Sequence, residues 1–317
     1  MSEATSNRDY VYAIAASPDF GRDGVGFVAR ESGLYRFDAH SGDWHDAYAS
    51  LNLPAALVTP AVALSPAYDE DRTVFAGTNG GVLRSEDGGE TWVLGVMPKP
   101  APVVSAVAVS PDFGTDGLVF AGTMEDGLLR SPDRGTQWHR WNFGLLDRRI
   151  LCVAVSPEFA ADATVLVGAD TGVFCSTNGG RSWRQLPFPP DLAPVLCAAL
   201  SPRGAGGASI FVGTESNGLY VSHDDGTVWT RLAEDLVPDV VTAIHLEAQD
   251  QAAPAVLVAT DARVYASRDG GVQWASVPVE LAAEESISAI CAPRGLAPGA
   301  PLLVGTSGGQ VVVAQVV

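Results

Sequence analysis

Six acidic side chains stand where a short apolar strand of this sequence gives way to a turn. They are Glu31, Glu125, Asp126, Asp170, Glu215 and Asp261. Two carboxyl groups about 5 to 10 Å apart can serve as the acid and base of glycoside hydrolysis, and Asp170, Glu215 and Asp261 are the candidates for such a pair. A rim of acids can also concentrate a cation, an amine or a basic peptide segment. The remaining alternative is that Asp and Glu are ordinary turn residues here.

A second set of candidate binding residues lies in one distinctive connection. It comprises Trp141, Phe143, Arg148 and Arg149. Aromatic and arginine side chains often anchor protein interfaces; the alternative is that Trp141 and Phe143 only cover the edge of a sheet. His245 is the one polar residue in a series of small ones, so it is either a hydrogen-bonded core residue or a ligand.

These candidates are positioned by a repeat. The pattern Ser-x-Asp-x-Gly-x-x-Trp occurs at 85–92, 131–138, 222–229 and 267–274, with Asn for Asp at 176–183 and a degenerate copy ending at Trp44. Each unit begins with an apolar strand that is followed by Ser-Pro, or by a degenerate form of this pair. The marker positions are Pro18, Pro66, Pro111, Pro157, Pro202, Ala248 and Pro293. Their spacing of roughly 45 residues is the period of a four-stranded propeller blade.

The strands of one unit can be read directly. In the third unit we expect strand A at 105–109, strand B at 118–123, strand C at 127–131, and strand D from Trp138. Alternating apolar residues and joints rich in Gly and Asp favour strands over helices. We therefore predict an all-β protein, with 1–317 forming a single seven-bladed β-propeller of four-stranded antiparallel blades. The blades are expected to start near residues 10, 58, 103, 149, 194, 240 and 285.

The pattern Ser-x-Asp-x-Gly-x-x-Trp is expected to form the turn between strands C and D, which we name the Ser-x-Asp turn. Its Asp can accept N–H groups of its own turn, its Gly can adopt a positive φ, and its Trp can pack between neighbouring sheets. A second fastening device is expected after each Ser-Pro, with an Asp a few residues on: Asp23, Asp71, Asp116 and Asp162. These carboxylates are thus interpreted as structural.

One face of strand A carries small side chains in nearly every unit. Counting back four residues from the Ser of Ser-Pro, or its equivalent, gives Ala13, Ala61, Ala106, Cys152, Cys197, Ala243 and Ser288. Counting back two gives Ala15, Ala63, Ala108, Ala154, Ala199, His245 and Ile290. Small side chains suit the crowded centre of a propeller, so Cys152 and Cys197 are interpreted as packing residues. The cysteines have no CxxC spacing, and neither a metal site nor a cofactor is expected.

The last unit lacks a Ser-x-Asp turn and ends with a third strand at 310–317. An edge strand with unpaired N–H and C=O groups can pair with another chain and aggregate. Closing the ring therefore requires a fourth strand or another contact. The residues before Tyr10 are one possible source of that strand. The other is direct contact between the first and last blades.

The formal net charge of −18 disfavours nucleic acid and anionic membranes as partners. The polar start has no apolar signal segment, and no apolar run is long enough to cross a bilayer. A cytoplasmic location is therefore expected.

The five full turns, together with a Gly-Thr pair at the end of strand B, resemble those of the Asp-box, or bacterial neuraminidase repeat, β-propellers. The Gly-Thr pairs are Gly77-Thr78, Gly122-Thr123, Gly213-Thr214 and Gly305-Thr306. The resemblance covers essentially the whole chain and implies the propeller fold. Its superfamily includes sialidases, xyloglucanase-type glycosidases, sortilin-like receptors and photosystem II assembly factors. The early arginines Arg22, Arg30 and Arg36 lack the Tyr/Glu pairing that a sialidase site needs.

In a propeller, the B–C turns and the D–A connections share one face around the channel, which we name the mouth face. We expect a non-catalytic interaction or scaffold module that binds a protein partner with a basic surface through the mouth face. The alternative is a glycosidase-like hydrolase that uses the mouth carboxylates. A third hypothesis is a small-ligand or metal-binding propeller that uses the acidic rim and His245.

Overall fold

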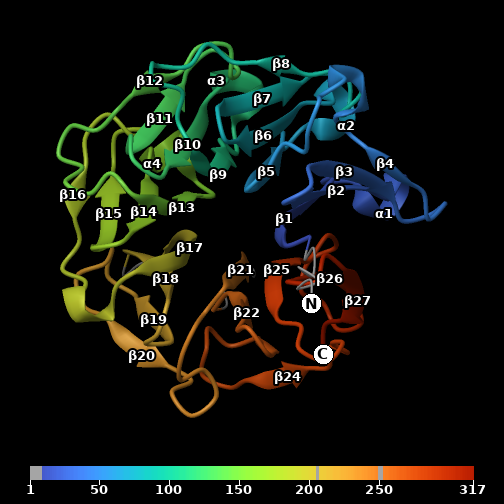
Figure 1. The fold of residues 1–317 in the computed structure, drawn as a ribbon. Helices are drawn as coiled ribbons and strands as arrows, with labels where there is room; N and C mark the ends of the chain where they lie inside the picture. The colour runs from blue at the N-terminus through green and yellow to red at the C-terminus, as the bar shows by residue number, and fades with distance from the viewer. Residues whose placement is uncertain (1–8, 205–206, 249–252) are drawn as a thin grey trace, which may run out of the picture.

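The fold comes from a computed structural model that describes residues 9–204, 207–248 and 253–317. Seven antiparallel sheets stand side by side around a central axis (Figure 1). In each sheet, the first strand along the chain lies innermost and the last strand lies towards the periphery. The seven-bladed β-propeller predicted from the repeat is confirmed.

The first four blades each contain four strands. Blade 1 comprises β1 (Val11–Ala16), β2 (Val25–Arg30), β3 (Leu34–Asp38) and β4 (Trp44–Asp46). Blade 2 comprises β5 (Ala61–Leu64), β6 (Val74–Thr78), β7 (Gly81–Ser85) and β8 (Val93–Leu94). Blade 3 comprises β9 (Val104–Val109), β10 (Val119–Thr123), β11 (Leu128–Ser131) and β12 (His139–Arg140). Blade 4 comprises β13 (Ile150–Val155), β14 (Val165–Ala169), β15 (Gly172–Ser176) and β16 (Arg184–Gln185).

The remaining blades include one with fewer strands. Blade 5 comprises β17 (Val195–Gly204), β18 (Gly207–Thr214), β19 (Leu219–Ser222) and β20 (Thr230–Leu232). Blade 6 comprises β21 (Ala243–Glu247), β22 (Ala255–Ala259), β23 (Val264–Ser267) and β24 (Ala275–Val277). Within the described residues, blade 7 has three strands: β25 (Ile287–Cys291), β26 (Pro301–Thr306) and β27 (Val311–Gln315).

The ring closes by direct packing of the first blade on the last. Val11 and Ile14 of β1 share an apolar cluster with Ala289 of β25 and Leu303 of β26, and β1 lies beside blade 7 in Figure 1. Residues 1–8, the other possible source of closure, lie outside the described part of the chain.

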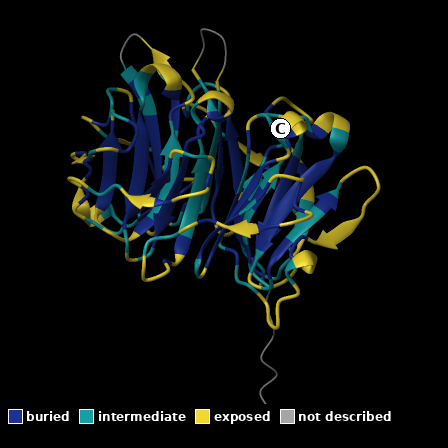
Figure 2. Ribbon diagram, turned by 90° about the horizontal axis from the view of Figure 1, so that it is seen from above, coloured by how far each residue is buried: buried dark blue, intermediate teal, exposed yellow. Residues whose placement is uncertain are grey.

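Apolar layers between neighbouring blades form the core. Between blades 3 and 4, for example, Phe120 and Leu128 pack with Val167, Phe174 and Trp183. Figure 2 shows the strands largely buried and the exposed residues concentrated in the loops. Burying one such side chain contributes roughly 1.5 to 3 kcal/mol, so each interface is a substantial source of stability.

In blades 1 to 4, the loop after strand A contains a single helical turn that was not expected from the sequence. These turns are α1 (Phe20–Asp23), α2 (Tyr68–Asp71), α3 (Phe113–Asp116) and α4 (Phe159–Asp162). The connections after strand D of blades 1 and 4 contain the 3-10 turns η1 (Ala49–Leu51) and η2 (Pro190–Leu192). In α1, Asp23 accepts hydrogen bonds from Ser17 Oγ (2.6 Å) and Val25 N (3.0 Å). The same two bonds recur at Asp71, Asp116 and Asp162. They tie each loop to both flanking strands.

Each Ser-x-Asp turn is held by its own side chains. Ser85 Oγ donates to Asp87 Oδ1 (2.7 Å) and accepts from Gly89 N (2.8 Å), while Thr91 N donates to Asp87 Oδ1 (2.9 Å). Trp92 Nε1 donates to Ala47 O of the preceding blade (2.7 Å). The turn carboxylate is therefore occupied by its own loop.

The small face of strand A is present, with one correction in the last unit. Ala289, rather than Ser288, pairs with Gly305, and Ala289 and Cys291 pack against blade 1. Ile290 faces the other way, towards blade 6. The count back from Ser-Pro was wrong by one residue here, because Pro293 lies one position closer to Ala289 than Pro111 lies to the equivalent Ala106.

Two cysteines of this face are packing residues. Cys152 Sγ lies against Gly168, and Cys197 Sγ lies against Gly213 and Val241. Burial raises the pKa of Cys152 to about 12 and raises that of Cys197 well above its ordinary value. Both thiols are therefore protonated at neutral pH, which disfavours reactivity.

Candidate functional site

The acidic rim is smaller than the sequence suggests. Four of the six acids are exposed on the B–C turns: Glu31, Glu125, Glu215 and Asp261. Asp126 instead pairs with Arg140 (Nη2 to Oδ1, 2.9 Å), and Asp170 pairs with Arg149 (Nε to Oδ2, 3.3 Å). The two ion pairs neutralise part of the rim, and Arg149 is engaged in holding Asp170.

The three candidate catalytic carboxylates come from successive blades. Asp170 follows β14, Glu215 follows β18, and Asp261 follows β22. Asp261 lines a pocket of about 290 Å³, and Asp235, Asp239 and Arg263 are the other charged residues of its lining. Neither Asp170 nor Glu215 lines that pocket, so it does not unite the predicted acid and base.

The connection from Trp141 to Arg149 is fastened at both ends to the mouth face. Asn142 accepts a hydrogen bond from Leu128 N (2.8 Å) and donates to Asp126 O (2.7 Å). Asp147 accepts from Thr171 N (2.9 Å) and Thr171 Oγ1 (2.8 Å) in the next blade. These contacts join the B–C turns of blades 3 and 4. They hold a preformed loop, from which Leu146 projects with 79% of its surface exposed.

The two aromatic residues of this connection differ in burial and in the residues they contact. Trp141 is half-buried, and its ring lies 4.7 Å from the guanidinium carbon of Arg130. Phe143 is 79% exposed, but its carbonyl accepts from N of Trp183 (2.8 Å), beside a Ser-x-Asp turn. Phe143 therefore lies towards the outer rim, and Arg148, also exposed, lies beside Gly127 of a B–C turn.

Other exposed apolar side chains stand on the mouth face. Leu53, Val103 and Leu236 are 42%, 44% and 42% exposed. Each belongs to a different D–A connection, and Val103 bridges to Asn79 of a B–C turn. Sequence reasoning missed these residues and Leu146, because a single exposed leucine in a loop carries no pattern.

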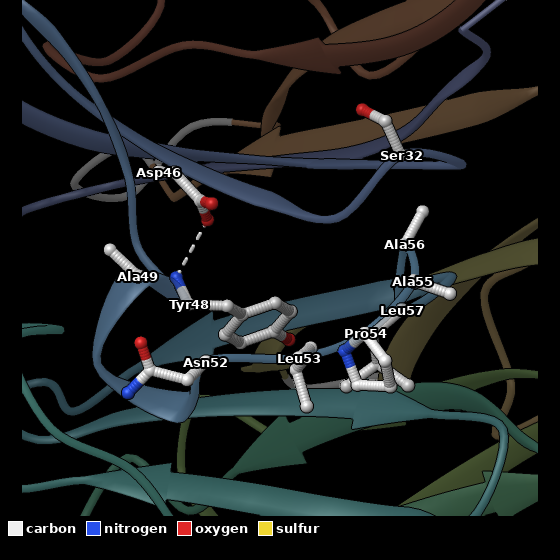
Figure 3. Close-up of a pocket in the computed structure, with 10 residues that line it drawn as sticks. All are labelled: Ser32, Asp46, Tyr48, Ala49, Asn52, Leu53, Pro54, Ala55, Ala56 and Leu57. Carbon is white, nitrogen blue, oxygen red and sulfur yellow. Dashed lines mark hydrogen bonds between the residues drawn. The ribbon is translucent and has the colours of Figure 1, made fainter.

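A pocket of about 490 Å³ opens beside the first B–C turn. Figure 3 shows Tyr48 in its centre, with Asp46 on one side and Leu53 and Pro54 on another. Asp46 Oδ1 accepts from Tyr48 N (2.8 Å), and the buried Tyr48 hydroxyl meets Thr59 Oγ1 (3.1 Å). Burial raises the pKa of Tyr48, so its phenol stays protonated. The lining combines aliphatic side chains with Ser32, Asn52 and the exposed carboxylate of Asp46, which suits a side chain that has an apolar stem and a polar or basic end.

His245 lies on β21, across from Leu257. Burial lowers the pKa of its imidazole, and the negative charge of Glu247 opposes this only in part. No hydrogen bond of the imidazole occurs within the described residues. Across the same residues, no three His, Cys, Asp or Glu side chains are grouped so that they could hold a metal ion. Nor do these residues include a helix of the length and hydropathy needed to cross a bilayer.

No protein-family model matches the sequence, and no curated protein matches it. Several solved structures do match its fold. A GH74 xyloglucanase from Xanthomonas campestris is 19% identical with a TM-score of 0.71, covering 99% of this chain and 53% of the enzyme. The chain thus spans about half the length of that enzyme.

Two further structures match at 13% identity. The first, YCF48 bound to D1 peptide, has a TM-score of 0.69, covering 98% of this chain and 94% of YCF48. The extracellular domain of a putative hybrid two component system from B. thetaiotaomicron has a TM-score of 0.68, covering 98% of this chain and 38% of that one. At these identities the likeness concerns the fold alone, and by fold this chain is a seven-bladed β-propeller.

Proposed function

We propose that this propeller is a non-catalytic interaction module that binds a segment of a partner protein on its mouth face. The observation that carries the proposal is the group of exposed apolar side chains on four D–A connections: Leu53, Val103, Leu146 and Leu236. Apolar side chains held on a rigid frame bind partners with little loss of conformational entropy. The fastened loop of Leu146 meets that condition.

The charges of the mouth indicate the chemistry of the partner. Glu31, Glu125, Glu215 and Asp261 are exposed around the same face, and the whole chain carries a net charge of −18. Such a field attracts basic groups and repels acidic ones. We therefore expect a partner segment that combines apolar with Lys or Arg side chains, and binding that weakens as salt is added.

The solved structures support this proposal only by analogy of fold. YCF48, with a bound peptide, matches over nearly its full length, so a single propeller of this size is known with a peptide ligand. The GH74 enzyme is about twice as long as this chain.

Recovery of partners from an extract of the native cells tests the proposal. The double variant Leu53→Ser and Leu146→Ser should recover about tenfold less of the partner, because two apolar anchors are lost. The matched control is Val228→Ser with Val272→Ser, two exposed valines in Ser-x-Asp turns on the opposite face. Equal losses in both variants, or none in either, would contradict binding at the mouth.

A glycosidase-like activity is the second candidate, favoured by the GH74 matches. Its test is release of reducing sugar from a panel of polysaccharides, comparing the wild type with Asp170→Asn, Glu215→Gln and Asp261→Asn. The interaction proposal predicts no turnover. Turnover that any of these substitutions abolishes would establish the hydrolase instead.

A further inference from the structure

An arginine recurs on strand C just before the Ser-x-Asp turn position in blades 1, 2 and 3. These residues are Arg36, Arg84 and Arg130. Arg36 and Arg84 reach the next blade, where each approaches the sixth residue of the following Ser-x-Asp turn. Arg36 Nη1 lies 2.9 Å from Glu90 Oε1, and Arg84 Nη1 lies 3.3 Å from Thr136 Oγ1. The first two arginines thus find an acceptor in the neighbouring blade.

The third interface breaks this rule. The sixth residue of the turn in blade 4 is Arg181, so a second cation stands where blades 2 and 3 present Glu90 and Thr136. The positive charge of Arg181 acts on Arg130 across the interface. Two like charges near one another repel, and an anion close to both relieves that repulsion.

Arg130 is buried without a charged partner. It is 8% exposed, and its Nε is buried with no hydrogen-bond acceptor. Its guanidinium makes no hydrogen bond or ion pair with any residue that the structure describes, and it stacks on the ring of Trp141. An uncompensated buried charge is costly, which makes this arrangement unusual.

Among the residues that the structure describes, no carboxylate is hydrogen-bonded or ion-paired to Arg130. Burial and the charge of Arg181 both lower the pKa of Arg130, and only Asp116 opposes them. The two oxygens of Asp116 bond other groups, since Oδ2 accepts from Ser110 Oγ (2.6 Å) and Oδ1 accepts from Leu118 N (2.8 Å). His139 pairs with Arg130 across β11 and β12, so its imidazole stands on the same face of the sheet.

We propose that the interface of blades 3 and 4 binds a tetrahedral oxyanion, a phosphate or sulfate group, between Arg130 and Arg181. A dianion neutralises both cations, and guanidinium groups bind such oxygens with paired N–H donors. His139 supplies a further N–H donor at the edge of the site. The site lies near a Ser-x-Asp turn, on the side away from the B–C turns, and does not depend on the function proposed for the mouth.

The test measures the thermal unfolding temperature as inorganic phosphate, sulfate or acetate replaces chloride at constant ionic strength. Wild type should unfold at a higher temperature with phosphate and sulfate than with chloride, because a ligand of the native state stabilises it. Acetate, with one charge and a planar group, should give little shift. Equilibrium dialysis with labelled phosphate should show one site per chain.

Variants built on the chain's own repeats make the test specific. Arg181→Glu recreates the Arg36–Glu90 pair, so it should unfold at a higher temperature than wild type in chloride and lose the phosphate shift. Arg181→Thr recreates the contact of Arg84 with Thr136 and should also lose the shift. The control is Arg184→Glu, which changes the charge equally at an exposed position opposite Cys175 on the other face of blade 4, and it should keep the shift.

Two results would overturn the site. One is a wild type that responds to phosphate no more than to chloride. The other is a phosphate shift of equal size in wild type, Arg181→Glu and Arg184→Glu, which would mean general salt stabilisation.

Discussion

At the scale of single residues, most conspicuous carboxylates in this chain satisfy N–H and O–H groups of their own loops. Asp23 and Asp87 each accept from a serine of the same loop and from backbone N–H groups beyond it. These roles were predictable because Asx turns are local. The ion pair of Asp126 with Arg140 was not, because it depends on how strand D lies beside the B–C turn.

One residue-scale prediction concerns Ala163, which follows α4 with a φ of 49°. The equivalent residue after α1 and α3 is glycine, at φ 63° and 62°. A left-handed conformation costs an alanine about 1 to 2 kcal/mol, part of which a glycine recovers. Ala163→Gly should therefore raise the free energy of unfolding by up to about 1 kcal/mol in urea titrations.

Ala161→Gly is the matched control. Ala161 lies inside α4 without a positive φ, so glycine there should lower the free energy of unfolding by about 1 kcal/mol. Equal effects of the two substitutions would show that backbone strain at Ala163 is not the cause.

A second residue-scale prediction concerns His245. Its folded pKa lies below the ordinary value because burial disfavours the imidazolium. The unfolded chain therefore binds the proton more tightly, and this residue lowers stability as pH falls below about 6.5. His245→Ala, which places the residue of blades 1 to 5 here, should reduce the loss of stability between pH 8 and pH 5. Identical pH profiles of wild type and variant by urea titration would refute this.

At the scale of elements, the turns and strands were largely predictable. In the third unit the expected strands at 105–109 and 118–123 are found as Val104–Val109 and Val119–Thr123. Alternating apolar residues specify a strand within a few positions. The four-residue helices after Ser-Pro were missed, because one turn is too short to show a helical period. The register of β25 was misplaced because it was counted back from Pro293, which lies one position closer to the Gly-paired residue than the equivalent Pro111.

The Ser-x-Asp turn gives the prediction at this scale. Burial acts to raise the pKa of Asp87, but hydrogen bonds from Thr91, Ser85 and Glu90 outweigh it and lower that pKa. A lowered carboxyl pKa stabilises the fold above the unfolded pKa of about 4, and this contribution is lost as pH falls through the folded pKa.

Asp87→Asn should therefore cost about 1 kcal/mol at pH 7 and less at pH 3, measured by urea unfolding at both pH values. Blade 4 shows that the amide fits the turn, since Asn178 Oδ1 accepts from Ser182 N (2.9 Å) and Nδ2 donates to Ser182 Oγ (2.7 Å). An unchanged difference between pH 7 and pH 3 would argue against a charged acceptor in this turn.

At the scale of the whole molecule, the repeat period specified the architecture, whereas the candidate site was only partly visible. The B–C turns that carry Glu31 and Glu215 follow from the repeat. The bonds of Asn142 and Asp147 that hold the loop of Leu146 join different blades, so they arise only when the ring is assembled. Exposed leucines likewise become a surface only when their connections share one face.

The central claim is that the mouth face binds a partner protein, and site-specific photo-crosslinking in the native cells tests it most directly. A photoreactive amino acid at Leu146 is compared with one at Val272, because both side chains are 79% exposed and they lie on opposite faces. We predict that Leu146 crosslinks to one defined protein and that Val272 does not. Crosslinks to the same protein from Val272 alone, or equally from both positions, would contradict the claim.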